Sequence, residues 1–226
     1  FEAKSHIDIM EALDMADFET GSKVSGFRGY FLKNDGALLS FAIWQYAKDF
    51  WMKRGFQFMI APSLVRKQTL LGTGFLPQGE EDLYKTQDVK GLIRVHEFFK
   101  LEQVALCEAS HEKSVELHEE INKNTEEFIQ SLGIPYQVVA NCGGDLGLGQ
   151  VKKYDINLWV PAEKTYREIS SASYSHDFQT RRLNIKYQEG PDKKYVHILN
   201  GTAFAIGRTI IAILENCQQK DGSILV

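Results

Sequence analysis

Four segments of the chain are predicted to be helices from the spacing of their apolar residues and from the residues that flank them. Asn34-Asp35 suits the N-cap of the second helix, and Gly55 suits the position just beyond its end. Ser110 suits the N-cap of the third helix, which Gly133-Ile-Pro135 should end. The four predicted helices are residues 6–16, 34–55, 110–132 and 203–219.

The helix predicted at residues 34–55 is apolar on more than one side. One helical stripe consists of Leu39, Ile43, Tyr46, Ala47 and Phe50. The opposite side still carries Phe41, Trp44 and Trp51. A helix with this pattern is buried either centrally in its own core or between the core and a partner, and we expect the second arrangement.

Shorter segments with strand-like patterns lie between these helices, and short loops join the later ones. Loops of that length cannot make parallel crossovers, so the sheet should be mainly antiparallel. The sequence therefore predicts an α+β fold, a mainly antiparallel sheet flanked by helices. Residues 21–29 and 66–89 are predicted to be irregular. The predicted strands are residues 56–60, 92–105, 136–140, 153–160, 165–173, 184–187 and 195–199.

Composition fits one globular domain of 226 residues, 1–226, that needs no disulfides to be stable. The 43% hydrophobic and 25% charged residues exclude a disordered chain or a rod. No apolar run is long enough for a membrane helix. A net charge of −4 excludes a generally basic nucleic-acid-binding coat but not a local basic patch. Three widely spaced cysteines predict free thiols in the cytoplasm.

Polar residues gather in three clusters that could carry chemistry. If Arg94 to Glu102 is a strand, its alternate residues put Arg, His, Phe, Lys and Glu on one face, which lines either solvent or a ligand. Arg167 to Ser173 places a carboxylate and hydroxyls in a strand, a weak indication of an oxygen-ligand metal such as Mg²⁺. In Leu199 to Arg208, small residues lead from a strand into a helix.

Arg208 is unusual because it falls in the first turn of the last helix, where the helix dipole repels a cation. An anionic ligand would explain it, although a surface arginine pointing away is an alternative. Gly143 to Gly149 lacks a phosphate-loop context and predicts a tight connection between strands. The chain has no nucleophile elbow and no Cys/His metal spacing. His6, His111, His118 and His176 are expected to have surface or structural roles.

Taken together and in order, several motifs resemble seryl-tRNA synthetases, which are class II aminoacyl-tRNA synthetases. The resemblance covers nearly the whole chain and implies the class II catalytic-domain fold. Its carriers are Val24-Ser-Gly26, Tyr30-Phe-Leu32, Gly72-Thr-Gly74, residues 91–98 with Lys100 and Glu102, Gly144 to Gly147, Tyr154-Asp155, Trp159, Pro161, Arg167 to Ser171, Asp177 to Gln179, Arg181-Arg182, His197 to Thr202, Gly207-Arg208 and Leu214 to Asn216.

The resemblance implies that L-serine reacts with ATP and Mg²⁺ to give seryl-adenylate, and that serine then passes to the 3′ end of its tRNA. The serine carboxylate is already a nucleophile, so alignment and charge stabilisation at the phosphates would supply the catalysis. That agrees with clusters that contain Arg, Glu and Ser but no nucleophile–base pair.

The resemblance also implies a set of site residues. Arg208 should hold the γ-phosphate of ATP, Phe98 should stack on adenine, and Arg208 with Glu168 should be catalytic. Three positions depart from the family's usual residues, namely Glu97, Thr202 and Asn157, and only the last has no explanation. The expected ATP contacts are Val95, His96, Glu97, Phe98, Glu168, Ile169, Ser170, Ser171 and Arg208; the metal ligands are Glu168 and Ser171; the serine contacts are Glu102, Asn200 and Thr202.

One departure is large. Between Gln87 and Asp88 the family has several dozen more residues, which include a Thr-x-Glu serine-binding motif and the arginine that grips the α-phosphate. Either that segment exists and is missing from the sequence in hand, which we favour, or it has been deleted. The family's N-terminal helical arm, which binds tRNA, is also absent. Two other functions therefore stay open: a related ligase that loads a carrier protein, and a truncated, non-catalytic domain. The predicted 34–55 helix and the resemblance both imply a homodimer.

Overall fold

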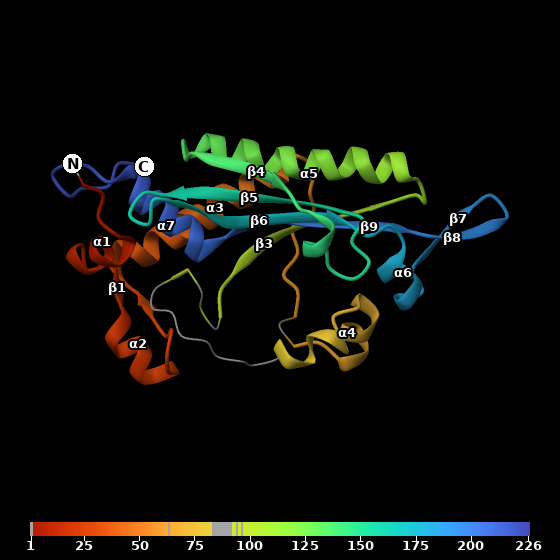
Figure 1. Ribbon diagram of the computed structural model, residues 1–226, viewed down its shortest axis with the longest axis horizontal. Coiled ribbons are helices and arrows are strands. Elements are labelled where there is room, and N and C mark those ends of the chain that lie inside the picture. The colour runs from red at the N-terminus through yellow and green to blue at the C-terminus, as the bar shows by residue number, and fades with distance from the viewer. Residues whose placement is uncertain (1, 63, 83–91, 94, 96) are drawn as a thin grey trace.

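The computed structural model describes residues 2–62, 64–82, 92, 93, 95 and 97–226, and its centre is a five-stranded sheet (Figure 1). Each strand runs antiparallel to its neighbours, as predicted. In spatial order the strands are β3 (Lys100–Cys107), β9 (His197–Ala205), β6 (Thr165–Tyr174), β5 (Lys152–Val160) and β4 (Tyr136–Ala140).

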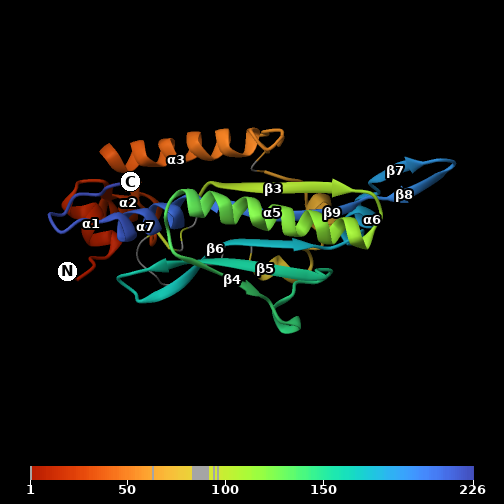
Figure 2. The ribbon, with the colours of Figure 1, turned by 90° about the horizontal axis from the view of Figure 1, so that it is seen from above.

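One long helix, α5 (His111–Ser131), lies along one face of this sheet (Figures 1 and 2). Its N-cap is Ser110, whose Oγ accepts a hydrogen bond from the Lys113 amide at 3.1 Å, as the sequence predicted. The helix contacts the sheet through polar as well as apolar side chains. Gln103 of β3, for example, donates from Nε2 to Thr125 Oγ1 at 2.9 Å.

The main core lies where α3 (Asn34–Met52) and α7 (Ile206–Cys217) meet the sheet. Helix α7 is rich in Ile and Leu and is almost wholly buried. Phe128 of α5 packs between Trp51 and Phe204, with ring centroids 4.9 and 5.6 Å away. Helix α3 thus contributes Trp51 and Trp44 to the core, whereas its Phe41 is 74% exposed.

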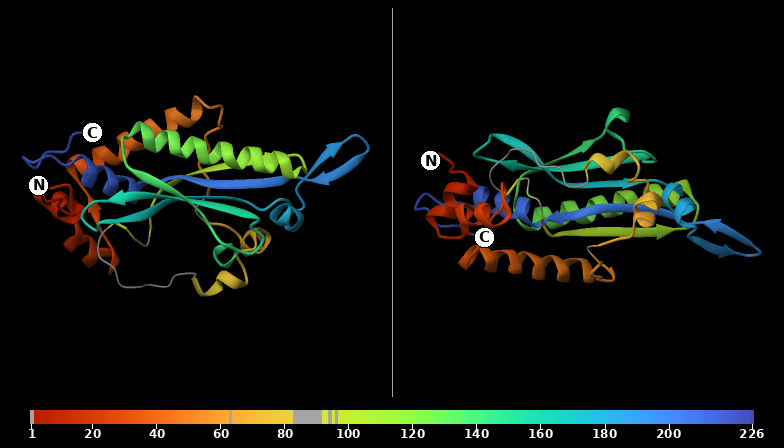
Figure 3. Two further views of the ribbon diagram at one scale, coloured as in Figure 1. Left: turned by 45° about the horizontal axis from the view of Figure 1, so that its top comes forward. Right: turned by 90° about the horizontal axis from the view of Figure 1, so that it is seen from below.

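Smaller elements surround the sheet. Figure 3 shows α4 on the side of the sheet opposite α5, close to α6, while β7 and β8 form a hairpin that projects from the body. These elements are α1 (His6–Ala12), β1 (Ala16–Asp17), α2 (Phe18–Ser25), β2 (Phe31–Leu32), α4 (Lys67–Thr73), α6 (Phe178–Leu183), β7 (Lys186–Glu189), β8 (Asp192–Tyr195) and two 3₁₀ turns, Gln78–Asp82 and Gly143–Asp145.

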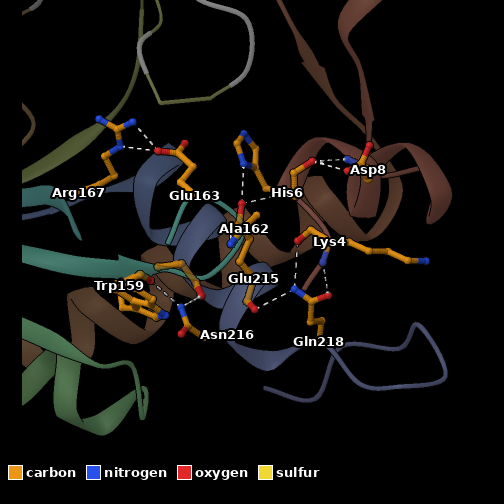
Figure 4. A network of polar contacts seen from close by, with 12 residues as sticks. Lys4, His6, Asp8, Trp159, Ala162, Glu163, Arg167, Glu215, Asn216 and Gln218 are labelled. Atoms are coloured by element: carbon orange, nitrogen blue, oxygen red, sulfur yellow. Dashed lines mark hydrogen bonds and ion pairs between the residues drawn. The ribbon is translucent and has the colours of Figure 1, made fainter. Parts of the chain in front are cut away.

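A buried polar network joins the N-terminal segment to α7 (Figure 4). Glu215 accepts hydrogen bonds from the His6 amide at 2.9 Å and the Ala162 amide at 3.0 Å, and it pairs with His6 Nδ1 at 2.9 Å. Gln218 and Asn216 extend the network to Lys4 and to the Trp159 carbonyl. His6 therefore has a structural role, as expected.

Several predictions of local structure are wrong. Residues 21–29 are not all loop, because Asp17 caps α2 through the Thr20 amide and Lys23 pairs with Glu19. Likewise, α4 and a 3₁₀ turn lie within residues 66–89. Asn34 does not cap α3; its side chain bonds to Asp14, and Lys33 occupies the N-cap without a side-chain hydrogen bond.

Strand boundaries also differ from the prediction. Residues 56–60 are not a strand, because no strand of the described part of the chain pairs with them. The predicted 92–105 strand begins only at Lys100. Residues 203–205 extend β9 rather than start the last helix, because Phe204 and Ala205 pair with β3. The predicted 184–187 and 195–199 strands become the β7–β8 hairpin and the start of β9. None of the helices in the described residues combines the length and apolarity needed to cross a bilayer.

Candidate active site

One face of the central sheet turns away from α5 and carries the polar side chains that the sequence singled out. An added Cβ on Gly201 would lie 3.4 Å from Ile121 of α5, so Gly201 faces that helix. Thr202 is the next residue on β9 and therefore faces the other way. Its partner in the register is Glu102 of β3, and cross-strand partners share a face.

A β-bulge brings Glu168 and Ser171 of β6 onto this same face. The two residues are three apart, and in a regular strand they would point to opposite faces. In the register, however, Glu168 pairs with Asn157 and Ser171 pairs with Asp155, with a shift between Ile156 and Asn157. Because Asp155 and Asn157 are two apart on β5, their partners must share a face. The extra residue of the bulge therefore creates the pair that the metal prediction requires.

Glu102 and Thr202 form a hydrogen-bonded pair at the edge of the site. Thr202 Oγ1 donates to Glu102 Oε1 at 2.7 Å, and Lys100 forms an ion pair with the same oxygen. The second oxygen, Glu102 Oε2, is buried and has no hydrogen-bond partner among the described residues. An acceptor without a partner at such a place is suited to a ligand that donates, such as an ammonium group or a hydroxyl.

Arg208 lies at the start of α7 and is fixed by two backbone carbonyls. Its Nε donates to the Ile93 carbonyl at 3.2 Å, and its Nη1 donates to the Glu168 carbonyl at 2.5 Å. These two carbonyl oxygens orient the guanidinium. Arg208 therefore lies in the first turn of α7, as predicted, and it is next to Glu168.

A cavity of about 280 Å³ joins these groups. Gly207 borders it at a point where an added Cβ would lie 3.2 Å from the Leu92 carbonyl, so a larger residue would crowd the wall. A volume of this size suits a small ligand or part of a nucleotide. The cavity is lined by Leu92, Ile93, Val95, Phe98, Lys100, Glu168, Ile169, Thr202, Ala205, Gly207 and Arg208.

The expected site residues divide into three groups. Val95, Phe98, Glu168, Ile169, Thr202 and Arg208 all line the cavity. His96 lies outside the described residues. The others do not line the cavity. Glu97 is exposed, and Ser170 is buried and donates to the Thr202 carbonyl. Asn200 is exposed two residues before Thr202 on the same face, Glu102 accepts a hydrogen bond from Thr202, and Ser171 shares the face of Glu168 without reaching the cavity wall.

The two predicted metal ligands, Glu168 and Ser171, offer the oxygen donors that a magnesium ion prefers. Mg²⁺ in nucleotide sites takes one or two protein oxygens and completes its shell with phosphates and waters. Glu168 offers a carboxylate at the cavity, and Ser171 offers a hydroxyl on the same face. Among the described residues, no group of three or more His, Cys, Asp or Glu could hold a metal unaided.

Sequence reasoning missed several lining residues as site members. The sequence places Lys100 in a row of polar residues and in a family motif but assigns it no role in the site, although it pairs with Glu102. Leu92, Ile93 and Ala205 are apolar, and nothing in their pattern distinguishes a cavity wall from a core. The role of the Ile93 carbonyl in holding Arg208 has no sequence signal at all, because it depends on the backbone.

Comparison with known proteins gives consistent results. Residues 80–217 match the family described as "tRNA synthetase class II core domain (G, H, P, S and T)". A serine–tRNA ligase from Deinococcus radiodurans is 37% identical over 275 residues, which include all of this chain and 65% of the relative. That span is 49 residues longer than the 226 of this chain.

Two solved structures are similar throughout. The seryl-tRNA synthetase of Pyrococcus horikoshii, complexed with ATP, matches all of this chain with a TM-score of 0.90 and 36% identity. The cytoplasmic serine–tRNA ligase of Naegleria fowleri, in complex with AMP, matches 96% of it with a TM-score of 0.88 and 31% identity. The chain spans 61% and 63% of these two proteins.

The antiparallel sheet with its flanking helices, the polar face and the matched residues agree with one another. The chain belongs to the class II tRNA synthetase core family, and within it the chain is similar to seryl-tRNA synthetases.

Proposed function

We propose that this chain, residues 1–226, provides the catalytic domain of a seryl-tRNA synthetase. Serine and ATP would react in its cavity to give seryl-adenylate and pyrophosphate, and serine would then be transferred to the 3′ end of tRNA. The observation that carries the proposal is the arrangement of Arg208, Glu168 and the Glu102–Thr202 pair around one cavity.

The first step needs charge stabilisation rather than a base. A carboxylate oxygen of serine attacks the α-phosphorus of ATP, the bond between the α- and β-phosphates breaks, and pyrophosphate leaves. Arg208, held by two carbonyls, would bind the γ-phosphate and stabilise the leaving pyrophosphate. Glu168 and Ser171 would hold Mg²⁺, which offsets the negative charge of the phosphates when bound.

The two ends of the cavity suit the two substrates. Phe98, Val95 and Ile169 of β6 line the cavity and would offer apolar surface for the adenine. His96, Glu97 and Ser170, their neighbours in the sequence, complete the expected set of ATP contacts. Glu102 and Thr202 would contact the serine, and Asn200 lies beyond them on the same face. Glu102 Oε2, which forms no hydrogen bond with any described residue, would accept one from the amino or hydroxyl group of serine.

Exchange of labelled pyrophosphate into ATP tests this function directly. We expect exchange that depends on serine and that Arg208→Ala reduces by at least about a hundredfold, since one electrostatic contact to a reacting phosphate contributes that much. Circular dichroism should show that the variant is folded. Equal exchange with glycine or alanine in place of serine would contradict the assignment.

The segment expected between Gln87 and Asp88 decides whether the chain as written is active. The matched span of the Deinococcus ligase is 49 residues longer than this chain, which either a segment missing from the sequence or a true deletion would produce, so a non-catalytic domain is kept as the second candidate. Trypsin should release Thr86-Gln-Asp-Val-Lys90 only if the chain is continuous there. Detection of this peptide by mass spectrometry would mean that the segment is deleted.

Two partners belong to the same proposal. The tRNA for serine would bind through an arm outside this sequence, and the domain would form a homodimer in the cytoplasm. Exposed apolar residues of α3, Leu38 and Phe41, together with Met59 and Ile60, support the dimer. Free thiols at Cys107, Cys142 and Cys217 agree with a reducing compartment.

A further inference from the structure

Arg28 lies outside the cavity described above, in the loop between α2 and β2, and it is buried. The whole residue is only 8% exposed. Two of its guanidinium nitrogens, Nε and Nη2, are buried and have no hydrogen-bond partner among the described residues. The guanidinium carbon Cζ lies over the Phe27 ring, 5.5 Å from the ring centroid.

Leaving the Nε and Nη2 donors of a buried guanidinium without hydrogen-bond partners is energetically costly. Arginine cannot lose its proton in a protein, so this group stays charged. A buried charge without a partner costs several kcal/mol of folding free energy. Nε and Nη2 lie in the guanidinium plane and donate from the same edge of the group, and this pair of donors binds the two oxygens of a carboxylate or phosphate side by side. The edge therefore has the geometry of a two-oxygen anion site.

The loop holds Arg28 rigidly in this position. Its φ angle is 68°, a left-handed conformation that an arginine adopts only at a cost of about 1–2 kcal/mol. Tight packing of the loop against α2 enforces it: a Cβ on Gly21 would lie 2.4 Å from the Tyr30 Cα, and a Cβ on Gly29 would lie 2.2 Å from the Gly21 carbonyl oxygen. Backbone strain that the surroundings maintain is concentrated at functional sites.

The same loop lies close to the residues that precede β3. Burial, and secondly the charge of Glu97, raises the pKa of Tyr30, so the Glu97 carboxylate is within electrostatic range of this loop. Residues 92, 93, 95 and 98, on either side of Glu97, line the cavity. Arg28 itself does not line the cavity.

From these observations we propose that Arg28 is a second anion-binding site, which takes an oxyanion with two coplanar oxygens through Nε and Nη2. The site does not depend on the proposed serine activation. A phosphate group and a carboxylate share the required chemistry, and they can be distinguished by titration.

Arginine Nε–Hε resonances of the ¹⁵N-labelled protein provide the test. We expect the Arg28 resonance to shift saturably with inorganic phosphate at constant ionic strength, and a parallel titration with acetate identifies whether phosphate or carboxylate binds better. The resonance is assigned by its absence in Arg28→Lys. Arg54 is the matched control because its Nη2 already binds Glu127 at 2.6 Å, so its resonance should not shift saturably.

Thermal stability gives a second measurement. Phosphate should raise the melting temperature of the wild type and of Arg208→Gln, whose substitution alters only the proposed nucleotide site. Arg28→Gln should weaken phosphate binding by at least about tenfold, because a hydrogen bond to a charged group contributes that much. If Arg28→Gln does not fold, Arg28→Lys should fold and show the same weakening. The proposal is wrong if neither anion shifts the Arg28 resonance, or if both Arg28 variants keep the full response to phosphate.

Discussion

The pair of Glu102 and Thr202 is the part of the site in which single side chains should determine which amino acid binds. The two side chains come from neighbouring strands that are distant in the sequence, and they meet through a 2.7 Å hydrogen bond. One oxygen of the glutamate remains buried without a partner among the described residues. Sites built to form hydrogen bonds with a substrate reject analogues that lack the matching group.

Thr202→Val should therefore impair serine use while leaving ATP use intact. The substitution keeps the shape but removes the hydroxyl that orients Glu102. We expect the KM for serine in pyrophosphate exchange to rise about tenfold to a hundredfold, with the KM for ATP nearly unchanged. Thr202→Ser retains the hydroxyl and serves as the control. A variant in which both KM values rise equally would argue against a role in serine binding.

Glu215 is a single buried side chain that should contribute to the stability of the fold. It is 2% exposed and accepts hydrogen bonds from the His6 and Ala162 amides. Glu215→Ala should lower the free energy of unfolding by about 3 kcal/mol, because it leaves buried donors without partners. Urea denaturation followed by circular dichroism measures this effect. Glu163→Ala, which breaks only the exposed pair with Arg167, should cost less than about 1 kcal/mol, and an equal loss in both variants would contradict the prediction.

At the scale of elements, α5 is notable for the polar groups that it buries against the sheet. His118 is fully buried, and its Nε2 lies 3.0 Å from the Ala172 carbonyl, which requires the proton on Nε2. Its Nδ1 is buried and has no hydrogen-bond partner in the described part of the chain. Burial lowers the pKa of this histidine below 6.5, and the nearby charge of Lys152 lowers it further. The folded protein therefore favours the neutral imidazole.

Acidification should consequently weaken the packing of α5. Because the pKa of His118 is lower in the folded state, the unfolded chain binds more protons below pH 6.5, and stability falls as pH decreases from there. We expect the free energy of unfolding to fall by up to about 1.4 kcal/mol per pH unit for this group. His118→Gln should reduce that slope in urea titrations between pH 7.5 and 5.5. Part of the pH dependence should remain in this variant, because burial also lowers the pKa of His176, and the nearby His197 and His111 lower it further. An unchanged slope would contradict the prediction.

The bulge in β6 shows what an element-level pattern could and could not predict. The sequence predicts a strand over residues 165–173, and the structure has strand β6 there (Thr165–Tyr174). Its alternation alone puts Glu168 and Ser171 on opposite faces, so the sequence pattern did not bring them together. The register with β5 does so, because one extra residue is accommodated between the partners of Asn157 and Ile156.

At the scale of the whole molecule, α3 exposes large apolar side chains that nothing in the chain covers among the described residues. Leu38 is 65% and Phe41 is 74% exposed, although Trp44 and Trp51 on the same helix pack into the core. Ile43 and Ala47 of the predicted stripe are buried, but the assignment of Trp44 and Trp51 to the opposite side is wrong, because both pack into the same core. Phe41→Asp should convert the proposed dimer to monomer at micromolar concentration, as measured by light scattering. Val24→Asp places the same charge on α2 at a residue that is 70% exposed and should leave the dimer intact. A wild-type protein that is monomeric would contradict the proposed dimer.

The sequence by itself determined the elements with strong local signals and the residue types of the site. Helix α5 was predictable because Ser110 and Gly133 mark its ends, and Arg208 stood out because a cation at a helix N-terminus needs a reason. The tertiary structure alone decided which polar residues meet. The Glu102–Thr202 pair, the facing of Glu168 with Ser171, and the carbonyls that hold Arg208 all depend on strand register and backbone position. Contacts between residues a hundred positions apart are fixed by the packing of the whole sheet, and no local pattern in the chain encodes them.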